Sequence, residues 1–341
     1  MKKLNLINNL EELEENLSKP SQRVIDTMAD IKGNILILGA SGKIGPTLTR
    51  MIKKAVGESK KVIGVAKFSD ETIRKKLEKY RIETIKCNLL DRENFDKLPD
   101  AENIIYLVGM KFGSVNNEPL TWAVNTGLPS LVIDKYRHSK IIVLSTGNIY
   151  PFVSVKSRGS IETDTPEPVG EYAQSCFGRE RICQYFSEKY KTPMTIIRLN
   201  YAVELRYGVL FDIAMKVKKG IPIDLSTGYV NVIWQTDANR GILLSFQACS
   251  SSPEILNLTG PDIISIKKIA IRFGEIFNKQ VIFKNIEEET CLLSNAKKFF
   301  DLFGYPETTL ETMITSIAHW IKIGGQSYNK PTYFEKRNGK F

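Results

Sequence analysis

Residues 33–56, "GNILILGASGKIGPTLTRMIKKAV", carry the clearest structural signal in the chain. It begins with a short apolar run typical of a buried strand, passes through a glycine-rich loop and continues as a helix. Gly39 permits a tight turn, Gly42 lets the backbone approach a pyrophosphate, and Gly45 lets the helix pack closely on the strand. The helix N-terminus offers unpaired N–H groups and a partial positive charge. The loop therefore predicts a binding site for dinucleotide phosphates, completed by Ser41, Lys43 and Ile44.

Strands and helices alternate on the C-terminal side of this stretch. Apolar runs typical of strands recur at 61–66, 82–87, 103–109, 140–146 and 194–199. Patterns typical of helices lie between them, with a long helix at 119–137 and another at 172–190. Such alternation predicts an α/β fold with a doubly wound parallel sheet of the Rossmann kind.

The regular alternation weakens after Asn200, which predicts a smaller, interleaved C-terminal lobe. Amphipathic helices are expected there at 208–220, 265–277 and 308–322. We divide the chain into four segments: an N-terminal helical extension (1–32), the dinucleotide-binding domain (33–200, with later segments returning to it), a substrate-binding lobe (201–325) and a tail (326–341).

Composition narrows the functional classes. The net charge is +10, but the lysines are scattered among acidic residues rather than gathered in one run, so we expect no nucleic-acid partner. No apolar run approaches the ~20 residues of a membrane span, so we expect no membrane partner. The odd number of cysteines, five, favours a reducing compartment, and we expect a cytoplasmic protein. Two histidines and no C-x-x-C pair give no basis for a metal site.

Several motifs in the same order resemble extended short-chain dehydrogenase/reductases of the NAD-dependent epimerase/dehydratase family. They are "GASGKIG", "CNLLD", "LVGMKFGS", "VNTGLPSLV", "VLSTGNIYP", "EYAQS" and "RLNYAV", and the resemblance covers about residues 33–325. It implies a bound NAD or NADP, with contacts from the second and third motifs at Asn88, Leu89, Val108, Gly109 and Lys111.

The choice between NAD and NADP depends on the end of the second strand. An acidic residue there would accept a hydrogen bond from the ribose of NAD. In "VIGVAKFSD" the position holds Ala66, followed by Lys67. Lys67 is either an ordinary surface lysine or a cation for the 2′-phosphate of NADP, and we favour NADP.

The resemblance implies that Thr146 and Tyr172 are catalytic. Thr146 occupies the position of the family's Ser or Thr hydroxyl, and Tyr172, 26 residues later, that of its tyrosine. A phenol can donate or accept a proton at the reacting oxygen, while the hydroxyl holds that oxygen in place. The alternative is that Tyr172 is simply an aromatic residue at a helix start. Tyr172 also counts among the expected cofactor contacts.

Cys176 departs from the family pattern, which has a lysine four residues after the tyrosine. A lysine there lowers the pKa of the tyrosine, which a neutral thiol cannot do. We interpret Cys176 as a packed thiol rather than a nucleophile. Lys111, on the loop after the fourth strand, is the preferred replacement cation, although it could equally be a solvated loop lysine. Arg179 lies two helical turns from Tyr172, so its reach is doubtful, and it could be a surface residue.

Candidate substrate contacts come from the C-terminal half. The resemblance implies Asn200 in "RLNYA", and Asn231, Trp234 and Gln235 in "YVNVIWQTD". Trp234 fits the core equally well. Arg206 is an optional clamp for a carboxylate or phosphate.

Together these features predict an NAD(P)-dependent oxidoreductase or epimerase/dehydratase acting on a sugar, a sugar acid or a nucleotide sugar. The alternative is a dinucleotide-binding sensor or scaffold with a degenerate active site. A polar cavity with free space above the nicotinamide favours the enzyme, and a filled one favours the sensor. The resemblance also implies a homodimer, paired through the helices at 118–137 and 172–190.

Overall fold

The computed structural model describes residues 6–340, and its central element is a seven-stranded parallel sheet. The spatial order of the strands is β12-β7-β5-β4-β1-β2-β3, and every neighbouring pair is parallel. The strands are β1 (Ile35–Leu38), β2 (Val62–Ala66), β3 (Glu83–Lys86), β4 (Asn103–Tyr106), β5 (Lys140–Thr146), β7 (Met194–Leu199) and β12 (Glu254–Leu258). The order confirms the doubly wound sheet, and it reverses between β1 and β4, where a crevice opens at the carboxyl ends of the strands.

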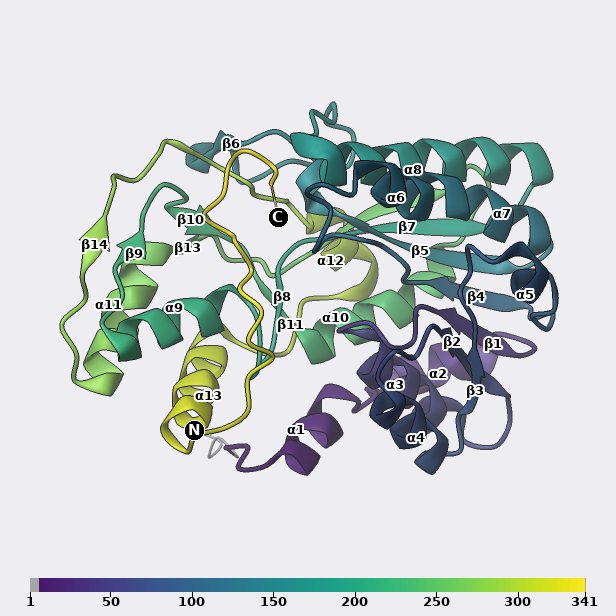
Figure 1. Cartoon of the computed structure of the whole chain (residues 1–341), viewed down its shortest axis with the longest axis horizontal. Helices are drawn as coiled ribbons and strands as arrows, with labels where there is room; N and C mark the ends of the chain where they lie inside the picture. The colour runs from purple at the N-terminus through teal and green to yellow at the C-terminus, as the bar shows by residue number, and fades with distance from the viewer. Residues whose placement is uncertain (1–5, 341) are drawn as a thin grey trace.

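Helices cover both faces of the sheet and make three layers (Figure 1). One face packs against α2 (Gln22–Asp30), α3 (Gly45–Val56), α4 (Glu71–Lys79), α10 (Gln235–Leu244) and α12 (Lys297–Phe303). The other face packs against α5 (Arg92–Asp96), α7 (Leu128–Lys135) and α8 (Gly170–Tyr190), with α6 (Glu118–Trp122) beside α8. Within β1, Ile35 and Ile37 enter the first core while Leu36 and Leu38 enter the second. This alternation is the period of a strand that is buried on both faces.

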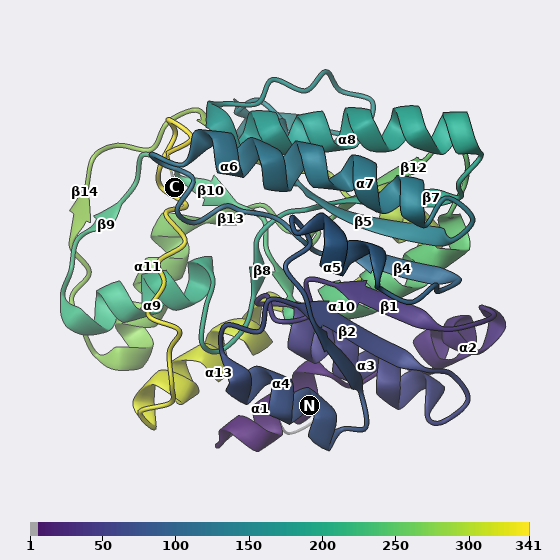
Figure 2. The ribbon, with the colours of Figure 1, turned by 45° about the vertical axis from the view of Figure 1, so that its right-hand side comes forward.

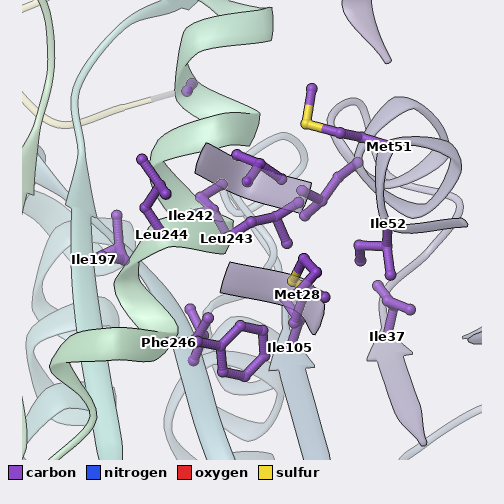
Figure 3. Close-up of a cluster of buried hydrophobic side chains, with 14 of the residues drawn as sticks. Met28, Ile37, Met51, Ile52, Ile105, Ile197, Ile242, Leu243, Leu244 and Phe246 are labelled. Carbon is purple, nitrogen blue, oxygen red and sulfur yellow. The ribbon is translucent and has the colours of Figure 1, made fainter. Parts of the chain in front are cut away.

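The first core is continuous across elements far apart in sequence. Figure 3 shows Met28 of α2, Ile52 of α3 and Ile105 of β4 in the same cluster as Ile242 and Phe246. The elements after Asn200 therefore do not all belong to the lobe. The strand β12 joins the main sheet although it comes after Asn200, and α10 and α12 cover it because their apolar faces match this core.

The smaller lobe lies beside the sheet domain (Figure 2). Its helices are α9 (Val209–Lys219), α11 (Ile266–Phe277) and α13 (Leu310–Lys322), close to the predicted ranges. Short paired strands complete it and link it to the sheet domain: β8 (Ala202–Val203) with β11 (Ile233–Trp234), β9 (Ile223–Asp224) with β14 (Phe283–Lys284), β10 (Tyr229–Val230) with β13 (Ile264–Ser265), and β6 (Val153–Ser154) with β15 (Thr290–Cys291).

The N-terminal segment forms α1 (Leu10–Leu17) and α2, which Pro20 separates. Leu13 and Leu17 of α1 are fully buried in the core of the lobe, whereas Val24 and Met28 of α2 are buried in the core of the sheet domain. This segment therefore contacts both parts of the molecule.

The C-terminal tail is extended and runs along the junction of the lobe and the sheet domain, in yellow in Figure 1. Phe334 is buried in the core of the lobe, and Glu335 forms an ion pair with Lys216 at 2.9 Å. Arg337 donates to the carbonyl oxygen of Thr290 at 2.6 Å. These contacts fix the tail on the surface of the lobe.

Candidate active site

The larger of two neighbouring cavities is a cleft of about 570 Å³ at the carboxyl ends of β1, β2 and β4. Gly39 has a φ of +96°, and a Cβ at Gly45 would lie 2.5 Å from the carbonyl oxygen of Ala40. Only glycine fits these two positions of the loop. The cleft is lined by nearly every residue predicted to bind the cofactor, namely Gly39, Ser41, Gly42, Lys43, Ile44, Gly45, Lys67, Asn88, Leu89, Val108, Gly109 and Lys111. Loop, helix N-terminus and cavity size therefore fit a dinucleotide.

The end of the cleft near β2 bears on the choice of cofactor. Lys67 and Ser69 line it and are exposed. Within residues 6–340, no acidic side chain lines this cleft. The acceptor that would bind the ribose hydroxyls of NAD is thus missing from the position where the fold usually provides it.

The second cavity is a chamber of about 250 Å³ between the sheet domain and the lobe. It shares Lys43, Ile44, Lys111 and Phe112 with the cleft, so the two cavities meet at the glycine loop and at the loop after β4. Polar groups on its walls are Thr146, Asn148, Tyr172, Asn200, Gln235 and Thr332. We refer to it below as the substrate chamber.

Thr146 and Tyr172 lie together on the wall of this chamber. Thr146 is the last residue of β5, and its hydroxyl accepts from the backbone N–H of Asn148 at 3.1 Å. Its side chain also forms a hydrogen bond with the phenol of Tyr172, which lies in the first turn of α8. Burial raises the pKa of Tyr172, and Cys176 raises it further, while Arg179 and the bond to Thr146 oppose the shift. The phenol is therefore protonated at neutral pH.

Cys176 is buried and packs against Ile149, Tyr150 and Leu292. Burial raises the pKa of its thiol. Arg179 and a hydrogen bond with Tyr172 oppose this shift, but burial has the larger effect, so the thiol stays neutral and unreactive. This environment agrees with the interpretation of Cys176 as a packed residue.

Lys111 lies near the phenol. Its Nζ is 5.7 Å from the centre of the Tyr172 ring and 5.9 Å from that of Phe112. Burial lowers the pKa of Lys111 to about 8, and the neighbouring Cys176 opposes that shift. The amine is half-buried and lines both cavities, so it is not a solvated loop lysine.

Arg179 is a buried cation, not the surface residue that the sequence suggested. Its guanidinium donates to the carbonyl oxygens of Asn125 at 3.1 Å and Leu144 at 2.7 Å, and to Oδ1 of Asn125 at 3.0 Å. The positive charge of Arg179 lowers the pKa of both Tyr172 and Cys176 against the effect of burial. Arg179 thus supplies a fixed positive charge that acts on Tyr172, although the family's lysine is absent.

A π-helical turn at Ala123–Gly127 positions this cation. It lies between α6 and α7 in what the sequence predicted as one continuous helix. Asn125, inside the turn, also donates to the hydroxyl of Ser175 and bonds both backbone groups of Met110. Asn125 therefore links the loop of Lys111 to α8. The motif "VNTGLPSLV" included Asn125, but nothing in the pattern indicated this role.

Only part of the predicted substrate set reaches the chamber. Asn200 and Gln235 line it. Asn231 is buried behind Asn200, whose side chain donates to it at 2.8 Å. Trp234 belongs to the core of the lobe, and its indole donates to Asn16 of α1. These positions correct the expectation that Asn231 and Trp234 face the substrate.

Arg206 does not line the substrate chamber either. Its guanidinium pairs with Glu204 at 2.9 Å and Glu14 at 3.1 Å, and it lies 4.6 Å from the ring centre of Tyr328. Two carboxylates already neutralise this cation, so it is not available as a clamp for an anion. Of these two partners, Glu204 is only two residues away, whereas Glu14 lies 192 residues away and was not predictable from the local sequence.

Residues 6–340 contain neither a candidate metal cluster nor a helix suited to cross a membrane. No group of three or more His, Cys, Asp or Glu side chains is arranged to hold a metal ion. In the same part of the chain, no helix has the length and apolar character needed to cross a membrane.

Several solved structures share this fold. UDP-glucuronic acid 4-epimerase from Bacillus cereus, in complex with NAD, is 19% identical with a TM-score of 0.71, over 85% of this chain and 96% of that one. UDP-glucose 4-epimerase from Thermotoga maritima, with UDP-glucose, is 20% identical with a TM-score of 0.70, over 85% and 98%. dTDP-glucose 4,6-dehydratase from Bacillus anthracis, in complex with NAD, is 17% identical with a TM-score of 0.70, over 85% and 97%. No curated protein matches the chain.

The sheet order and the glycine-loop cleft define a dinucleotide-binding Rossmann protein. The model of the NAD-dependent epimerase/dehydratase family matches residues 35–228, more than half of the chain. The chain therefore belongs to this family, and the resemblance inferred from its motifs is confirmed. It is an enzyme of the NAD(P)-dependent epimerase/dehydratase class.

Proposed function

We propose that the chain transfers hydride reversibly between a nicotinamide cofactor and a carbinol carbon of a sugar, a sugar acid or a nucleotide sugar. The observation that carries this proposal is the hydrogen-bonded pair of Thr146 and Tyr172 on the wall of the substrate chamber, directly beside the cofactor cleft. The chamber contains free space and polar walls, the feature that distinguishes an enzyme from a sensor with a filled site.

The roles of the side chains follow from their positions. A bound nicotinamide supplies or accepts the hydride. Thr146 holds the reacting oxygen, and Tyr172 exchanges a proton with it. Because burial keeps the phenol protonated, Tyr172 is prepared to donate its proton to a carbonyl oxygen. The charge distribution therefore favours the reductive half of the reaction.

Two residues together supply the positive charge beside the phenol. Arg179 supplies a permanent charge from below, since its guanidinium stays protonated. Lys111, with a pKa of about 8, is able to return a proton to Tyr172 after each transfer. We propose this pair as the replacement for the family's lysine, with Lys111 as a catalytic residue and Arg179 as a positioning residue.

The test is a screen of sugars, uronates and nucleotide sugars with NAD and NADP, followed at the absorbance band of the reduced nicotinamide. On a verified substrate, Tyr172→Phe should lower kcat by about 10²–10⁴-fold. Tyr305→Phe is the matched control, because Tyr305 is 69% exposed and lines neither cavity. If Tyr172→Phe turns over like wild type, the catalytic assignment is wrong.

Cys176 is the observation that favours the alternative, a dinucleotide-binding sensor or scaffold. Under that alternative the cofactor binds with ordinary affinity, but no substrate class gives turnover and Lys111→Ala has no catalytic consequence. The enzyme requires that Lys111→Ala lowers kcat by roughly 10²-fold or more on the same substrate.

We further propose NADP as the preferred cofactor, supported by Lys67 and by the lack of a carboxylate among the described residues of the cleft.

We also propose a homodimer that pairs α7 and α8 with their copies. Support comes from the partly exposed Phe177, Ile182 and Phe186 along α8 and the exposed Tyr185. Light scattering that returns the mass of one chain at micromolar concentration would exclude this dimer. A cytoplasmic location is proposed because all five cysteines are free thiols.

A further inference from the structure

The size of the substrate chamber limits what it can accept. A nucleotide sugar carries a nucleoside and a diphosphate in addition to its sugar, so it approaches the size of a dinucleotide. The dinucleotide cleft of this protein measures about 570 Å³, whereas the substrate chamber measures about 250 Å³. The smaller value lies below the range of roughly 300–1,000 Å³ that is usual for pockets of drug-sized ligands. The chamber matches one sugar ring.

The tail contributes Thr332 to the wall of the chamber, and its contacts with the lobe keep that residue in place. Thr332 lines the chamber, and its N–H and hydroxyl donate to the carboxylate of Asp212 at 2.7 and 2.6 Å. On either side of Thr332, Phe334 is buried in the lobe and the N–H of Tyr328 donates to the carbonyl oxygen of Arg206. Arg206 itself, the expected clamp for a phosphate, is engaged by carboxylates.

Lys43 gives the chamber its chemical character. Its Nζ lies 3.3 Å from the ring centre of Tyr207 and 4.1 Å from that of Phe112, so two aromatic faces hold the amine at the junction of the two cavities. Lys111 lines the same chamber, and within residues 6–340 no carboxylate lines it. The amine of Lys43, on the wall of a chamber that no described carboxylate lines, makes a binding site for an anion.

The surroundings of Lys43 bring the pKa of its amine close to neutral pH. Burial, together with the charges of Lys111 and Lys330, lowers the pKa of Lys43 to about 7, against the opposing effect of Asp212 and Glu204. An anionic ligand would favour the protonated form, so binding near neutral pH should be accompanied by proton uptake.

We propose that the substrate is an anionic monosaccharide derivative, bound through its carboxylate or phosphate by Lys43, rather than a nucleotide sugar. This inference rests on the hydride transfer proposed above and names the substrate class for the same chamber. Thr146, Asn148, Asn200 and Gln235 supply hydrogen-bonding groups for the sugar hydroxyls.

The test uses the full chain saturated with NADP or NAD and measures ligand binding by isothermal titration. Glucuronate, gluconate and glucose 6-phosphate are the anionic probes, and comparison among them separates a carboxylate from a phosphate. Glucose and UDP-glucose are the neutral and nucleotide-linked probes. We expect an anionic monosaccharide to bind at least tenfold more tightly than glucose or UDP-glucose. The heat should differ between buffers of unequal ionisation enthalpy, because protons are taken up.

Lys43→Met should weaken binding of the preferred anion by about 10- to 100-fold. Lys43→Arg, which keeps the charge, should restore most of this loss. Lys79→Met is the matched control, because Lys79 is an exposed lysine at the end of α4 that lines neither cavity. Both lysine variants are titrated with cofactor alone as well, so that a loss of cofactor binding is recognised.

Two results would overturn the inference. Tight binding of UDP-glucose with none of the anionic monosaccharides would show that the tail does not limit the substrate. An anion affinity unchanged by Lys43→Met would remove the role of this lysine. In either case the hydride-transfer proposal survives if Tyr172→Phe abolishes turnover of whichever sugar binds. It fails separately if no bound sugar is oxidised or reduced.

Discussion

Replacing Cys176 by lysine restores the residue that the family pattern lacks, and the structure predicts that it does not restore the charge. Cys176 and Arg179 are three residues apart on α8, a spacing that places their Cβ atoms about 5–6 Å apart. Two cations ~6 Å apart at an effective dielectric constant of about 20 repel each other by roughly 3 kcal/mol. That energy corresponds to about two pKa units.

Burial lowers the pKa of the new amine further. It already lowers the pKa of Lys111 to about 8 at the same site. We therefore expect the pKa of the new amine in the folded protein to lie well below its value of about 10.4 in the unfolded chain. Between these values the unfolded chain binds the additional proton, so the stability of Cys176→Lys should rise with pH. The slope relative to wild type should be about 1.4 kcal/mol per pH unit.

The assay is urea unfolding of wild type, Cys176→Lys and Cys176→Met at several pH values from about 6 to 10. Cys176→Met is the control for size without charge. Activity of Cys176→Lys at pH 7 should not exceed that of wild type. A flat difference in stability across this pH range, or a gain in rate with a lower pH optimum, would refute the reasoning. It would show that the lysine is charged and that Arg179 does not replace it.

Three further outcomes follow from the described contacts. Gly45→Ala should destabilise the protein by about 1–3 kcal/mol and abolish dinucleotide binding, because its Cβ would overlap the loop backbone; thermal unfolding and titration with NADP measure both. Lys67→Asp should reverse the cofactor preference from NADP to NAD in titration, and equal affinities in wild type would contradict it. Glu180→Ala should lower the free energy of unfolding in urea by about 3–5 kcal/mol, because the buried guanidinium of Arg198, 2.8 Å from Glu180, loses its carboxylate partner. The control is Glu188→Ala, at an exposed position on the same helix.

The sequence predicted the sheet and the glycine loop because both depend on local patterns. Apolar runs define the strands, and a turn with glycines at fixed spacing needs no distant partner. Thr146 and Tyr172 were identified in the same way, from short motifs at the ends of β5 and at the start of α8.

What the sequence did not predict depends on contacts between distant segments. Arg179 looked like a surface residue because its acceptors are backbone carbonyls, and one belongs to a π-helical turn that no composition signal marks. For Trp234 the sequence left open a substrate contact or a place in the core, because its partner Asn16 on α1 is 218 residues away. The role of the tail depends on Thr332 meeting Asp212, 120 positions earlier.

The position of α1 has a consequence for the synthesis of the protein. Asn16 of α1 accepts from Trp234 and Thr236, and Leu17 accepts from Asn239 through its carbonyl oxygen. A chain emerging from the ribosome at about 5–20 residues per second exposes α1 well before these partners exist. The helix α1 therefore cannot form these contacts until more than 200 further residues have been translated. Until then, Leu13 and Leu17 are exposed to water. We expect this long-range closure to be a late step of folding, and nascent chains that end before α10 to depend on chaperones.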